Sequence, residues 1–530
     1  MSETTAERAP ASARAGIALL VIAGLLLAGS IGYGVLNGSA AQPREGFVHA
    51  EDGQFMLDGE PFRYASSNAY TLMLESEPGV EVYLRTFQES AMPVARAWAF
   101  LDIGTEDGEL NVEGNNPGTF FQYWDEEAGA PAYNDGPDGL GKLDYLIWSA
   151  GQKDMRLILP LVNNWTAFGG MDQYVRWAGL DHRDEFFTDE TIRGWYKDWV
   201  THVLTRVNPL TGLAYKDDPT IMLWEIGNEL RCSDTGPYPV REECGSAMVL
   251  AWAQEMAAHV KSIDPDHMVG FGGEGFLCTE PDSEDTLVNC TESADPVALL
   301  EDPNIDAHGI HVYPNHWLPT TPTDDWEEWG AWWIEQHGQI AADAGKPYYL
   351  GEYGWIDQFE RMGVYDHWLQ AFYESGGDGS HFWIMQPEAS IAGPTDGVGF
   401  TQKCPGPACD LVGNWSRHVG QGTPWESFAP LAETDYATTT ADAPVTVDVL
   451  ANDKVYAEAG WDAAGLDLDP SAPGVQDSLT TEDGTFEVAA GAVTFEPAPG
   501  ASGTVRARYT ATDANGLVSP EARLSITVGD

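Results

Sequence analysis

Apolar residues in this chain form short runs that alternate with longer amphipathic stretches from about residue 47 to residue 428. Stretches such as 190–207 and 247–263 carry apolar residues three and four positions apart, which predicts helices. The short runs predict buried strands. They are PFRYASSN (61–68), MPVARAWAF (92–100), MRLILPLVN (155–163), TIMLWEIGN (220–228), HMVGFGG (267–273), IDAHGIHVY (305–313), PYYLGEYG (347–354) and SHFWIM (380–385).

This alternation predicts an α/β fold, a (β/α)8 TIM barrel with long loop insertions, because eight strand and helix units follow one another. We expect the barrel domain to span residues 42–432. Active sites of such barrels lie at the carboxyl ends of the strands, so those ends are where candidate chemistry is sought.

The pattern changes after Glu433, where no helical period is found and alternating runs are broken by Gly, Pro and Asn. Runs at 444–450, 492–498, 504–513 and 523–528 predict a small antiparallel β-sandwich over residues 433–530. The phrases DVLANDK, TDANG and FEPAPGASGT resemble bacterial cadherin-like and immunoglobulin-like modules of secreted enzymes. That resemblance implies a spacer or attachment role, with contact to a cell surface or a polysaccharide.

Four polar side chains of this module could bind calcium or form ordinary turns. The candidate residues are Asp448, Asn452, Asp453 and Asp513. Such side chains can ligate calcium, but they also stabilise turns through hydrogen bonds to the backbone. We favour the turn interpretation.

The N-terminus has the layout of an export segment. Arg8 and Arg14 precede an apolar run over residues 15–36, and small residues follow over 38–41. Residues 1–41 are therefore expected to be either a cleaved signal peptide or a retained membrane anchor, since the run is long enough to span a bilayer. Both alternatives place the rest of the chain outside the cytoplasm.

The six cysteines agree with that compartment. They fall into three near pairs that could each close a local loop, Cys232 with Cys244, Cys278 with Cys290 and Cys404 with Cys409. The chain has no C-x-x-C pair, so we expect no zinc site. No other metal and no cofactor are expected.

Charge excludes one class of partner. Lys and Arg number 26 against 83 Asp and Glu, a formal net charge of -57. Such a chain repels polyphosphate backbones, so no nucleic acid partner is expected. The acids are spread along the sequence, which predicts a heavily hydrated surface. Either this surface is adapted to high salt, or the chain is an acidic secreted protein of an ordinary medium. We expect a monomer.

Two glutamates lie at strand ends that face one another across the predicted barrel. Glu229 ends the fourth strand in LWEIGNELRC, and Glu352 ends the seventh in GEYG. Two carboxyl groups about 5–5.5 Å apart cleave a β-glycoside with retention, one as nucleophile and the other as acid and then base. The neighbouring motifs are equally specific. Asn228 directly precedes Glu229, and other strand ends carry Arg96 and Trp98 (VARAWAF), His311, Tyr313 and Trp383.

With these motifs the chain resembles glycoside hydrolase family 5 of clan A. The phrases LVNNWTAFGGMDQYVRWAG (161–179), IGNELRC (226–232) and HVYPNHW (311–317) resemble in particular the endo-β-1,4-mannanases of that family. The resemblance implies a secreted, retaining enzyme with β-mannan as substrate, Glu229 as acid/base and Glu352 as nucleophile. An exo-β-mannosidase or a β-1,4-glucanase on the same machinery remains the alternative, and a non-catalytic glycan-binding protein is a third.

The environments of the two glutamates suggest distinct ionisation. Arg96 and Tyr313 are expected to keep Glu352 ionised, whereas Glu229, beside an amide and aromatic walls, is expected to have a raised pKa. Asn228 is expected to bond the sugar 2-hydroxyl, and His311 to orient the acid or bond substrate. Glu225, four residues before Glu229, points into the barrel and is expected to be paired there rather than to touch sugar.

The remaining candidates are subsite residues. Trp383 resembles the aromatic floor beneath the cleaved sugar, while Asn164, Trp165 and Trp317 fit neighbouring subsites. Glu274 in GGEGF is either a subsite residue or a member of a structural ion pair. Leu230 departs from the family pattern, in which proline often follows the acid/base glutamate and shapes the loop. The resemblance therefore implies the role of Glu229 but not the shape of the adjoining subsite.

Overall fold

The structure is a computed structural model that describes residues 43–112, 118–318, 326–388, 399–462, 464–489 and 491–529. The predicted export segment, residues 1–41, lies outside the described residues. Within them, no helix has both the length and the apolar character needed to cross a membrane.

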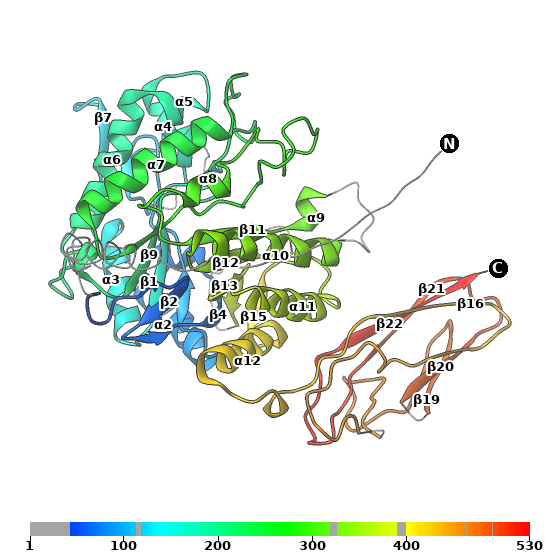
Figure 1. The fold of residues 1–530 in the computed structure, drawn as a ribbon. Helices are drawn as coiled ribbons and strands as arrows, with labels where there is room; N and C mark the ends of the chain where they lie inside the picture. The colour runs from blue at the N-terminus through cyan, green and yellow to red at the C-terminus, as the bar shows by residue number, and fades with distance from the viewer. Residues whose placement is uncertain are drawn as a thin grey trace, which may run out of the picture. The chain divides into compact units, whose positions relative to one another are not determined.

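Eight parallel strands form one sheet at the centre of residues 45–432, with helices outside it (Figure 1). The hydrogen-bonded order is β10-β9-β8-β5-β4-β13-β12-β11. Seven strands lie within the predicted runs, and β13 begins one residue before its run. The strands are β4 (Tyr64–Asn68), β5 (Val94–Arg96), β8 (Arg156–Pro160), β9 (Ile221–Glu225), β10 (Met268–Gly270), β11 (His308–Val312), β12 (Tyr348–Tyr353) and β13 (Gly379–Phe382).

Individual backbone hydrogen bonds, rather than a regular ladder, connect the two end strands of this sheet, β10 and β11. The Asp306 N–H donates to the Val269 carbonyl at 2.8 Å, and the His311 N–H donates to the Glu274 carbonyl at 3.3 Å. The strands are almost wholly buried because helices cover their outer faces and side chains fill the interior. The predicted barrel is confirmed.

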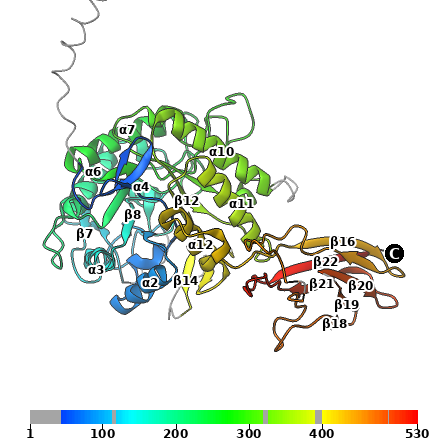
Figure 2. The same ribbon diagram turned by 60° about the horizontal axis from the view of Figure 1, so that its bottom comes forward.

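Long helices surround the strands, as Figure 2 shows from another side. The predicted helices at 190–207 and 247–263 are confirmed as α6 (Glu190–Thr205) and α7 (Ser246–Ile263). Asp189 caps α6, because its carboxylate accepts from the Thr191 and Ile192 N–H groups. The other helices of the barrel are α2 (Glu77–Glu89), α3 (Leu140–Gly151), α4 (Gly170–Ala178), α5 (Glu185–Thr188), α8 (Pro296–Leu300), α9 (Pro314–Trp317), α10 (Trp326–Ala344), α11 (Arg361–Glu374) and α12 (Pro407–Gln421), with short 3-10 turns η1 (Tyr70–Met73), η2 (Tyr215–Asp217) and η4 (Trp425–Ser427).

Small sheets outside the barrel were not anticipated from the sequence. An antiparallel sheet of β1 (His49–Glu51), β2 (Gln54–Leu57) and β3 (Glu60–Pro61) precedes the first barrel strand. A hairpin of β6 (Gln122–Asp125) and β7 (Ala130–Tyr133) and a parallel pair of β14 (Met385–Pro387) and β15 (Gln402–Cys404) lie in long loops.

All six cysteines form disulfides, in the three pairs that the sequence suggested. Cys232–Cys244 and Cys278–Cys290 each close a loop of 12 residues after β9 and β10, and Cys404–Cys409 ties β15 to α12. The first two therefore brace the loops that follow two neighbouring strands at their carboxyl ends.

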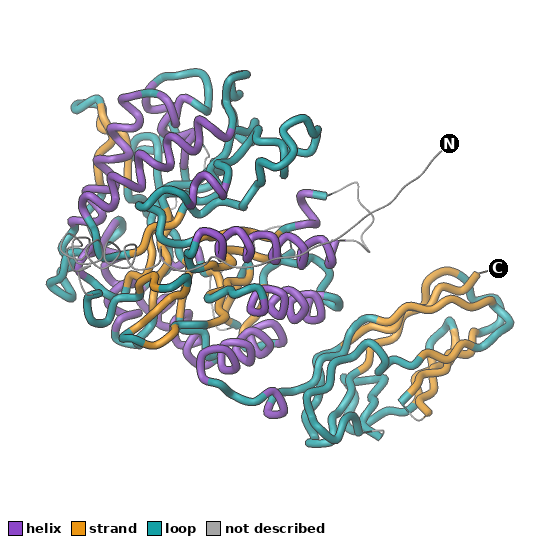
Figure 3. The backbone as a smooth tube through the Cα atoms, in the orientation of Figure 1, coloured by secondary structure: helices purple, strands orange, loops and turns teal. Residues whose placement is uncertain are grey.

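Residues 433–529 contain strands and no helix among those described (Figure 3). One sheet has the order β16-β22-β21 and the other β17-β20-β19-β18. All strand pairs are antiparallel except β16 with β22, which is parallel. The strands are β16 (Asp435–Thr440), β17 (Val445–Val447), β18 (Ser478–Thr480), β19 (Gly484–Ala489), β20 (Ala492–Pro497), β21 (Gly503–Tyr509) and β22 (Ala522–Gly529).

The two sheets enclose a core of their own that includes Phe486, Phe495, Tyr509 and Ile526. The sandwich expected here is confirmed. Asp513, one of the four calcium candidates, accepts from the Asn515 and Leu517 N–H groups, which is the turn role that the sequence favoured.

Candidate active site

A cleft of about 650 Å³ lies at the carboxyl ends of the barrel strands. Nine of the twelve side chains predicted for the site line it. They are Trp98, Trp165, Asn228, Glu229, Glu274, Tyr313, Trp317, Glu352 and Trp383. Arg96 and His311 are buried directly behind this wall, and Asn164 is buried away from the cleft.

Glu229 follows β9 in a short extension that neighbouring segments hold in place. The Asn228 N–H donates to the Val162 carbonyl at 2.8 Å, and the Glu229 N–H donates to the Gly272 carbonyl at 2.7 Å. Glu229 itself has a φ of 58°, a backbone conformation that residues other than glycine rarely adopt. This turn brings its carboxylate from the strand direction into the cleft.

Glu352 is part of β12 and is nearly fully buried. Arg96 Nη1 donates to Glu352 Oε1 at 2.7 Å, and the Tyr313 hydroxyl donates to Glu352 Oε2 at 2.8 Å. Both expected partners of this carboxylate are therefore in contact with it. They hold it in one orientation, with one lone pair of each oxygen already occupied.

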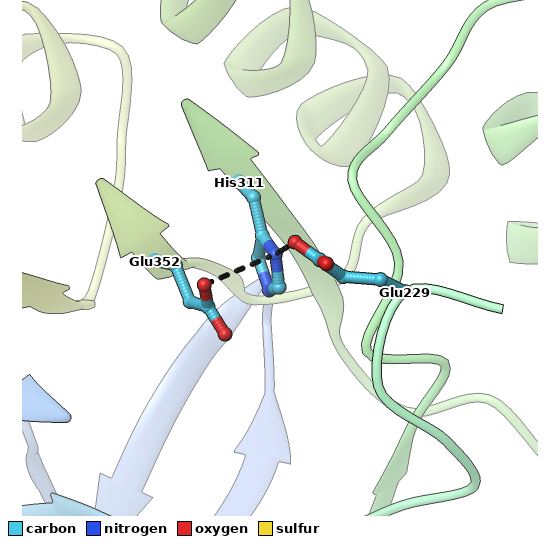
Figure 4. A group of neighbouring side chains, drawn as sticks. All are labelled: Glu229, His311 and Glu352. Carbon is cyan, nitrogen blue, oxygen red and sulfur yellow. Dashed lines mark hydrogen bonds and ion pairs between the residues drawn. The ribbon is translucent and has the colours of Figure 1, made fainter. Parts of the chain in front are cut away.

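His311 on β11 lies between the two glutamates (Figure 4). Its Nδ1 lies 2.5 Å from Glu229 Oε1 and 3.7 Å from Glu352 Oε2. One oxygen of each carboxylate lies within 4.8 Å of the other, which suits retention and is shorter than the separation of about 6.5–9.5 Å used for inversion. In the described parts of the chain, no other group of three His, Cys, Asp or Glu side chains comes so close together.

These contacts leave little reason to assign a metal to the group. Both carboxylates already receive donors, Arg96 and Tyr313 on Glu352 and His311 and Trp165 on Glu229. A buried pair of carboxyls with a histidine between them is suited to nucleophilic attack and proton transfer.

The ionisation of the two glutamates is opposite to the sequence-based expectation. His311, Arg231 and the Trp165 indole N–H together hold the pKa of Glu229 below its ordinary value despite the burial that raises it. Burial is the largest influence on Glu352 and, with the charge of Glu229, raises its pKa above the ordinary value, although His311, Arg96 and Tyr313 lower it. The prediction of a raised pKa for Glu229 is therefore wrong for the substrate-free site.

Aromatic rings form the floor of the cleft. Trp383, directly after β13, stacks on Tyr70 with centroids 5.3 Å apart and an angle of 8° between the planes. Trp98 lies 5.9 Å from Trp383 and 5.8 Å from Tyr70. Flat rings packed in this way hold one another rigid, and the exposed part of Trp383 faces the cleft beside Glu352.

The wall near Glu229 contains an ion-pair cluster. Arg231 Nη1 lies 3.2 Å from Glu274 Oε1 and 3.4 Å from Glu292 Oε2, and its guanidinium lies over the Trp165 ring at 5.2 Å. Glu274 thus fits both alternatives, because it lines the cleft and also belongs to an ion pair. Trp317 packs edge-on against Phe276 and reaches the cleft from α9.

Asn164 does not line the cleft. It is fully buried, and the neighbouring Asn163 takes the place at the wall, with its Oδ1 accepting from Asn228 Nδ2 at 3.1 Å. Successive residues of an extended segment point to opposite sides, so an error of one position exchanges wall and interior. The predicted subsite role of Asn164 is not supported by its place in the structure.

Leu230, the departure from the family pattern, is buried and does not line the cleft. Its side chain occupies the space that a Cβ at Gly227 would need.

Further residues that line the cleft were not predicted from the sequence. Arg231, Thr166, Ala167, Phe168 and His316 carried a usable signal, since they lie within the stretches that resemble the family. Tyr70 and Phe400 also line the cleft and lie in no such stretch.

Comparison with known proteins agrees with this geometry. The family model described as GH family 5 beta-mannosidase-like matches residues 45–366, and the model of a bacterial Ig domain matches residues 427–527. Mannan endo-1,4-beta-mannosidase 1 of Oryza sativa subsp. japonica is 35% identical over 395 residues, which are 69% of this chain and 84% of the relative. Mannan endo-1,4-beta-mannosidase F of Aspergillus fumigatus is 31% identical over 360 residues, 67% of this chain and 74% of the relative.

Solved structures show the same architecture. The endo-1,4-beta-mannanase from Rhizomucor miehei superposes with a TM-score of 0.64 and 33% identity, covering 71% of this chain and 99% of its own. The endo-beta-1,4-mannanase from Thermotoga petrophila has a TM-score of 0.63 and 27% identity, covering 89% of this chain and 100% of its own.

Proposed function

Because a family model matches well over half of its length, the chain belongs to glycoside hydrolase family 5, and we propose that it is a retaining endo-β-1,4-mannanase. The observation that carries the proposal is the pair of carboxylates, Glu229 and Glu352, which line the cleft with oxygens within 4.8 Å of each other. Relatives and solved structures named as endo-mannanases support the choice of mannan over other β-glycans.

In the first step, Glu352 acts as the nucleophile. Its carboxylate oxygen attacks the anomeric carbon, the glycosidic C–O bond breaks, and the leaving oxygen takes a proton from Glu229. Arg96 and Tyr313 hold the attacking carboxylate, while Trp383 supports the sugar from below. In the second step Glu229 accepts a proton from water, which attacks the glycosyl ester and releases Glu352.

The proton for the leaving group is shared by Glu229 and His311. The Nδ1 to Oε1 distance of 2.5 Å allows the proton to move between them, so a Glu229 pKa below its ordinary value in the free site does not prevent acid catalysis. Substrate that covers Glu229 removes water and favours the neutral carboxyl. Once Glu352 has become an ester, its charge no longer raises the pKa of Glu229, which suits the later role as base.

The extracellular location belongs to the proposal. Three disulfides favour a chain that folds in an oxidising compartment. We further propose that residues 42–432 form the catalytic domain, and that residues 433–530 serve as a spacer or attachment module with a cell surface or polysaccharide as its contact.

A panel of linear mannan, galactomannan, glucomannan and cellulose tests the substrate. Internal cleavage of mannan, with short products from mannohexaose and little action on cellohexaose, is expected. Mannose released only from chain ends would favour an exo-β-mannosidase, and cleavage of cellohexaose alone would favour a glucanase. NMR of the first-formed anomer tests retention, since an early α-product contradicts it.

The nucleophile is tested by Glu352→Ala in the full chain. We expect hydrolysis of mannan to fall at least about 10⁴-fold, because no other carboxylate occupies that position. Glu335→Ala is the matched control, since Glu335 is an exposed acid on α10. Intact hydrolysis by Glu352→Ala would refute the assignment of the nucleophile.

A further inference from the structure

Every N–H group of the buried Arg96 guanidinium has a partner. Nε donates to the Glu225 carboxylate at 3.0 Å, and Nη2 donates to Glu225 Oε2 at 2.7 Å and to Asn228 Oδ1 at 2.7 Å. Nη1 donates to Asn68 Oδ1 at 3.0 Å and to Glu352 Oε1 at 2.7 Å. A guanidinium has five donors in one plane, so this set of partners permits a single orientation.

Glu225 supplies the fork that fixes this orientation. It is the last residue of β9, it is fully buried, and it does not line the cleft. It grips the Nε and Nη2 edge of Arg96 and also accepts from the Tyr349 hydroxyl at 2.9 Å. A residue so placed cannot touch a substrate, and its effect on the reaction has to pass through Arg96.

The contacts between Glu225 and Arg96 determine how two residues that line the cleft, Glu352 and Asn228, are oriented. With one edge of the guanidinium held by Glu225, Nη1 points at Glu352 and the free Nη2 hydrogen points at Asn228 Oδ1. Asn228 must then turn its amide nitrogen toward Asn163 Oδ1, 3.1 Å away. One of the two Asn228 N–H hydrogens is thereby left for a ligand in the cleft.

Charge is divided by the same arrangement. The Arg96 cation faces two carboxylates, Glu225 and Glu352, with ion-pair distances of 2.7 Å to each. A carboxylate held by an undivided guanidinium would be strongly stabilised and therefore a weak nucleophile. The second carboxylate leaves Glu352 anchored but still basic.

We propose that Glu225 is a positioning residue of the hydrolytic reaction, which aims Arg96 at Glu352 and Asn228 and takes up part of its positive charge. The inference rests on the proposed function, because it assigns Glu352 as nucleophile. Other charged or titratable groups also face this network, and they are His311, Glu229, Tyr313 and Glu274 around Glu352, and Tyr349 and Tyr64 around Glu225.

The test is Glu225→Gln in the full chain, with a probe that reports the nucleophile alone. A 2-deoxy-2-fluoro-β-mannobiosyl fluoride transfers its glycosyl group to the attacking carboxylate and releases fluoride, which needs no proton from Glu229. The pH dependence of labelling at Glu352, followed by mass spectrometry, therefore follows the ionisation of that carboxylate. Hydrolysis of mannohexaose gives kcat and KM beside it.

In Glu225→Gln, Glu352 becomes the one carboxylate that pairs with the Arg96 guanidinium. We expect the acid limb of labelling to move down by about half a pH unit or more, because an undivided cation stabilises the carboxylate. The limiting rate should fall about tenfold or more as the nucleophile weakens, with kcat changing more than KM. A purely structural role of Glu225 would lower the yield or stability of the protein without moving the limb.

Tyr349→Phe is the matched control, since it removes one hydrogen bond to Glu225 and leaves the charge. Its acid limb should stay at the wild-type position. If Glu225→Gln does not fold, Glu225→Asp is the second variant. It keeps the charge, but its shorter side chain moves the carboxylate away from Arg96, so kcat should fall while the acid limb of labelling stays at the wild-type pH. The inference is overturned, and the proposed function is not, if the acid limb of Glu352 labelling in Glu225→Gln stays at the wild-type pH. A wild-type kcat in Glu225→Asp has the same consequence. A wild-type enzyme that neither takes up the label nor cleaves mannan overturns the proposed function with it.

Discussion

Tyr313 acts on Glu352 in the direction opposite to the one inferred for Glu225. Its hydroxyl donates to Glu352 Oε2, a bond that exists at full strength only while the carboxylate is ionised. The hydroxyl therefore lowers the pKa of a group that burial raises. The site holds its nucleophile between these two influences.

Tyr313→Phe removes this hydrogen bond and keeps the ring. We expect the acid limb of kcat/KM to move to higher pH, because Glu352 must be ionised to attack and its pKa rises when the donor is lost. A bond to a charged acceptor contributes about 1.5–3 kcal/mol, so kcat/KM at neutral pH should fall about 10- to 100-fold. The pH profile on mannohexaose checks it. Tyr373→Phe is the control, since the buried Tyr373 hydroxyl donates to the Tyr64 carbonyl and Tyr373 does not line the cleft. An acid limb that moves down would contradict this account.

The sequence predicted which residues form the site better than it predicted their ionisation and orientation. The identity of Glu229, Glu352, Arg96, His311 and Tyr313 followed from motifs at strand ends. The ionisation of Glu229 could not follow, since it depends on which donors reach it, and the indole of Trp165 comes from another loop. The exchange of Asn164 for Asn163 has a similar cause, because a motif does not specify which side of an extended segment faces the cleft.

At the scale of elements, period and composition predicted the barrel strands and the helices α6 and α7. Strands such as β8 (RLILP) and β9 (IMLWE) are largely apolar because both their faces are buried, whereas β4 (YASSN) and β13 (GSHF) carry buried polar side chains. The β6 and β7 hairpin and the β14 and β15 pair were not predicted because each of these strands has only three or four residues, too few to show a period. The parallel pairing of β16 with β22 joins segments far apart in sequence, which local pattern does not encode.

The sandwich also contains a buried acidic cluster that ties three of its segments together. The single hydroxyl of Tyr509, at the end of β21, faces several acceptors, with Asp435 Oδ2 at 2.9 Å and Asp453 Oδ1 at 3.2 Å. One proton cannot satisfy both carboxylates, so protonation of an acid is favoured. Burial accordingly raises the pKa of Asp435 to about 7 and that of Asp453 to about 8.

This cluster predicts a sandwich that weakens as pH rises. The folded state holds protons that the unfolded chain loses near pH 4, so stability is fully present below that pH and is lost as pH rises through about 7 to 8. Local opening of β20 and β21, measured in the full chain by hydrogen exchange corrected for the intrinsic rate, should increase about tenfold or more between pH 5 and pH 9.

Asp453→Asn removes the acid while its amide oxygen still accepts from the Glu433 N–H, as Asp453 Oδ1 does at 2.7 Å. The increase in opening with pH should become smaller in this variant. Asp442→Asn is the matched control, since Asp442 lies in an exposed turn of the same module. Opening that decreases toward pH 9 in the wild type would show that the cluster does not hold extra protons.

At the scale of the whole molecule, the dominant property is a formal net charge of -57. Like charges repel, and the repulsion disfavours the compact state because unfolding moves the charges apart. The effective range of this repulsion is about 10 Å at 0.1 M salt and about 3 Å at 1 M. Most neighbouring surface carboxylates therefore still interact at low salt and are screened from one another at molar salt.

We consequently expect the full chain to become more stable as sodium chloride rises from 0.05 to 1 M, with a thermal midpoint higher by about 5 °C or more. Screening also weakens the attractive surface ion pairs, but with 26 cationic against 83 acidic side chains the repulsive pairs dominate. The increment should shrink at pH 4.5, where many surface carboxylates are neutral, while sucrose, which does not screen charge, should stabilise to the same extent at both pH values. A midpoint that falls with salt at neutral pH would mean that ion pairs outweigh repulsion, and the surface could then not be regarded as adapted to high salt.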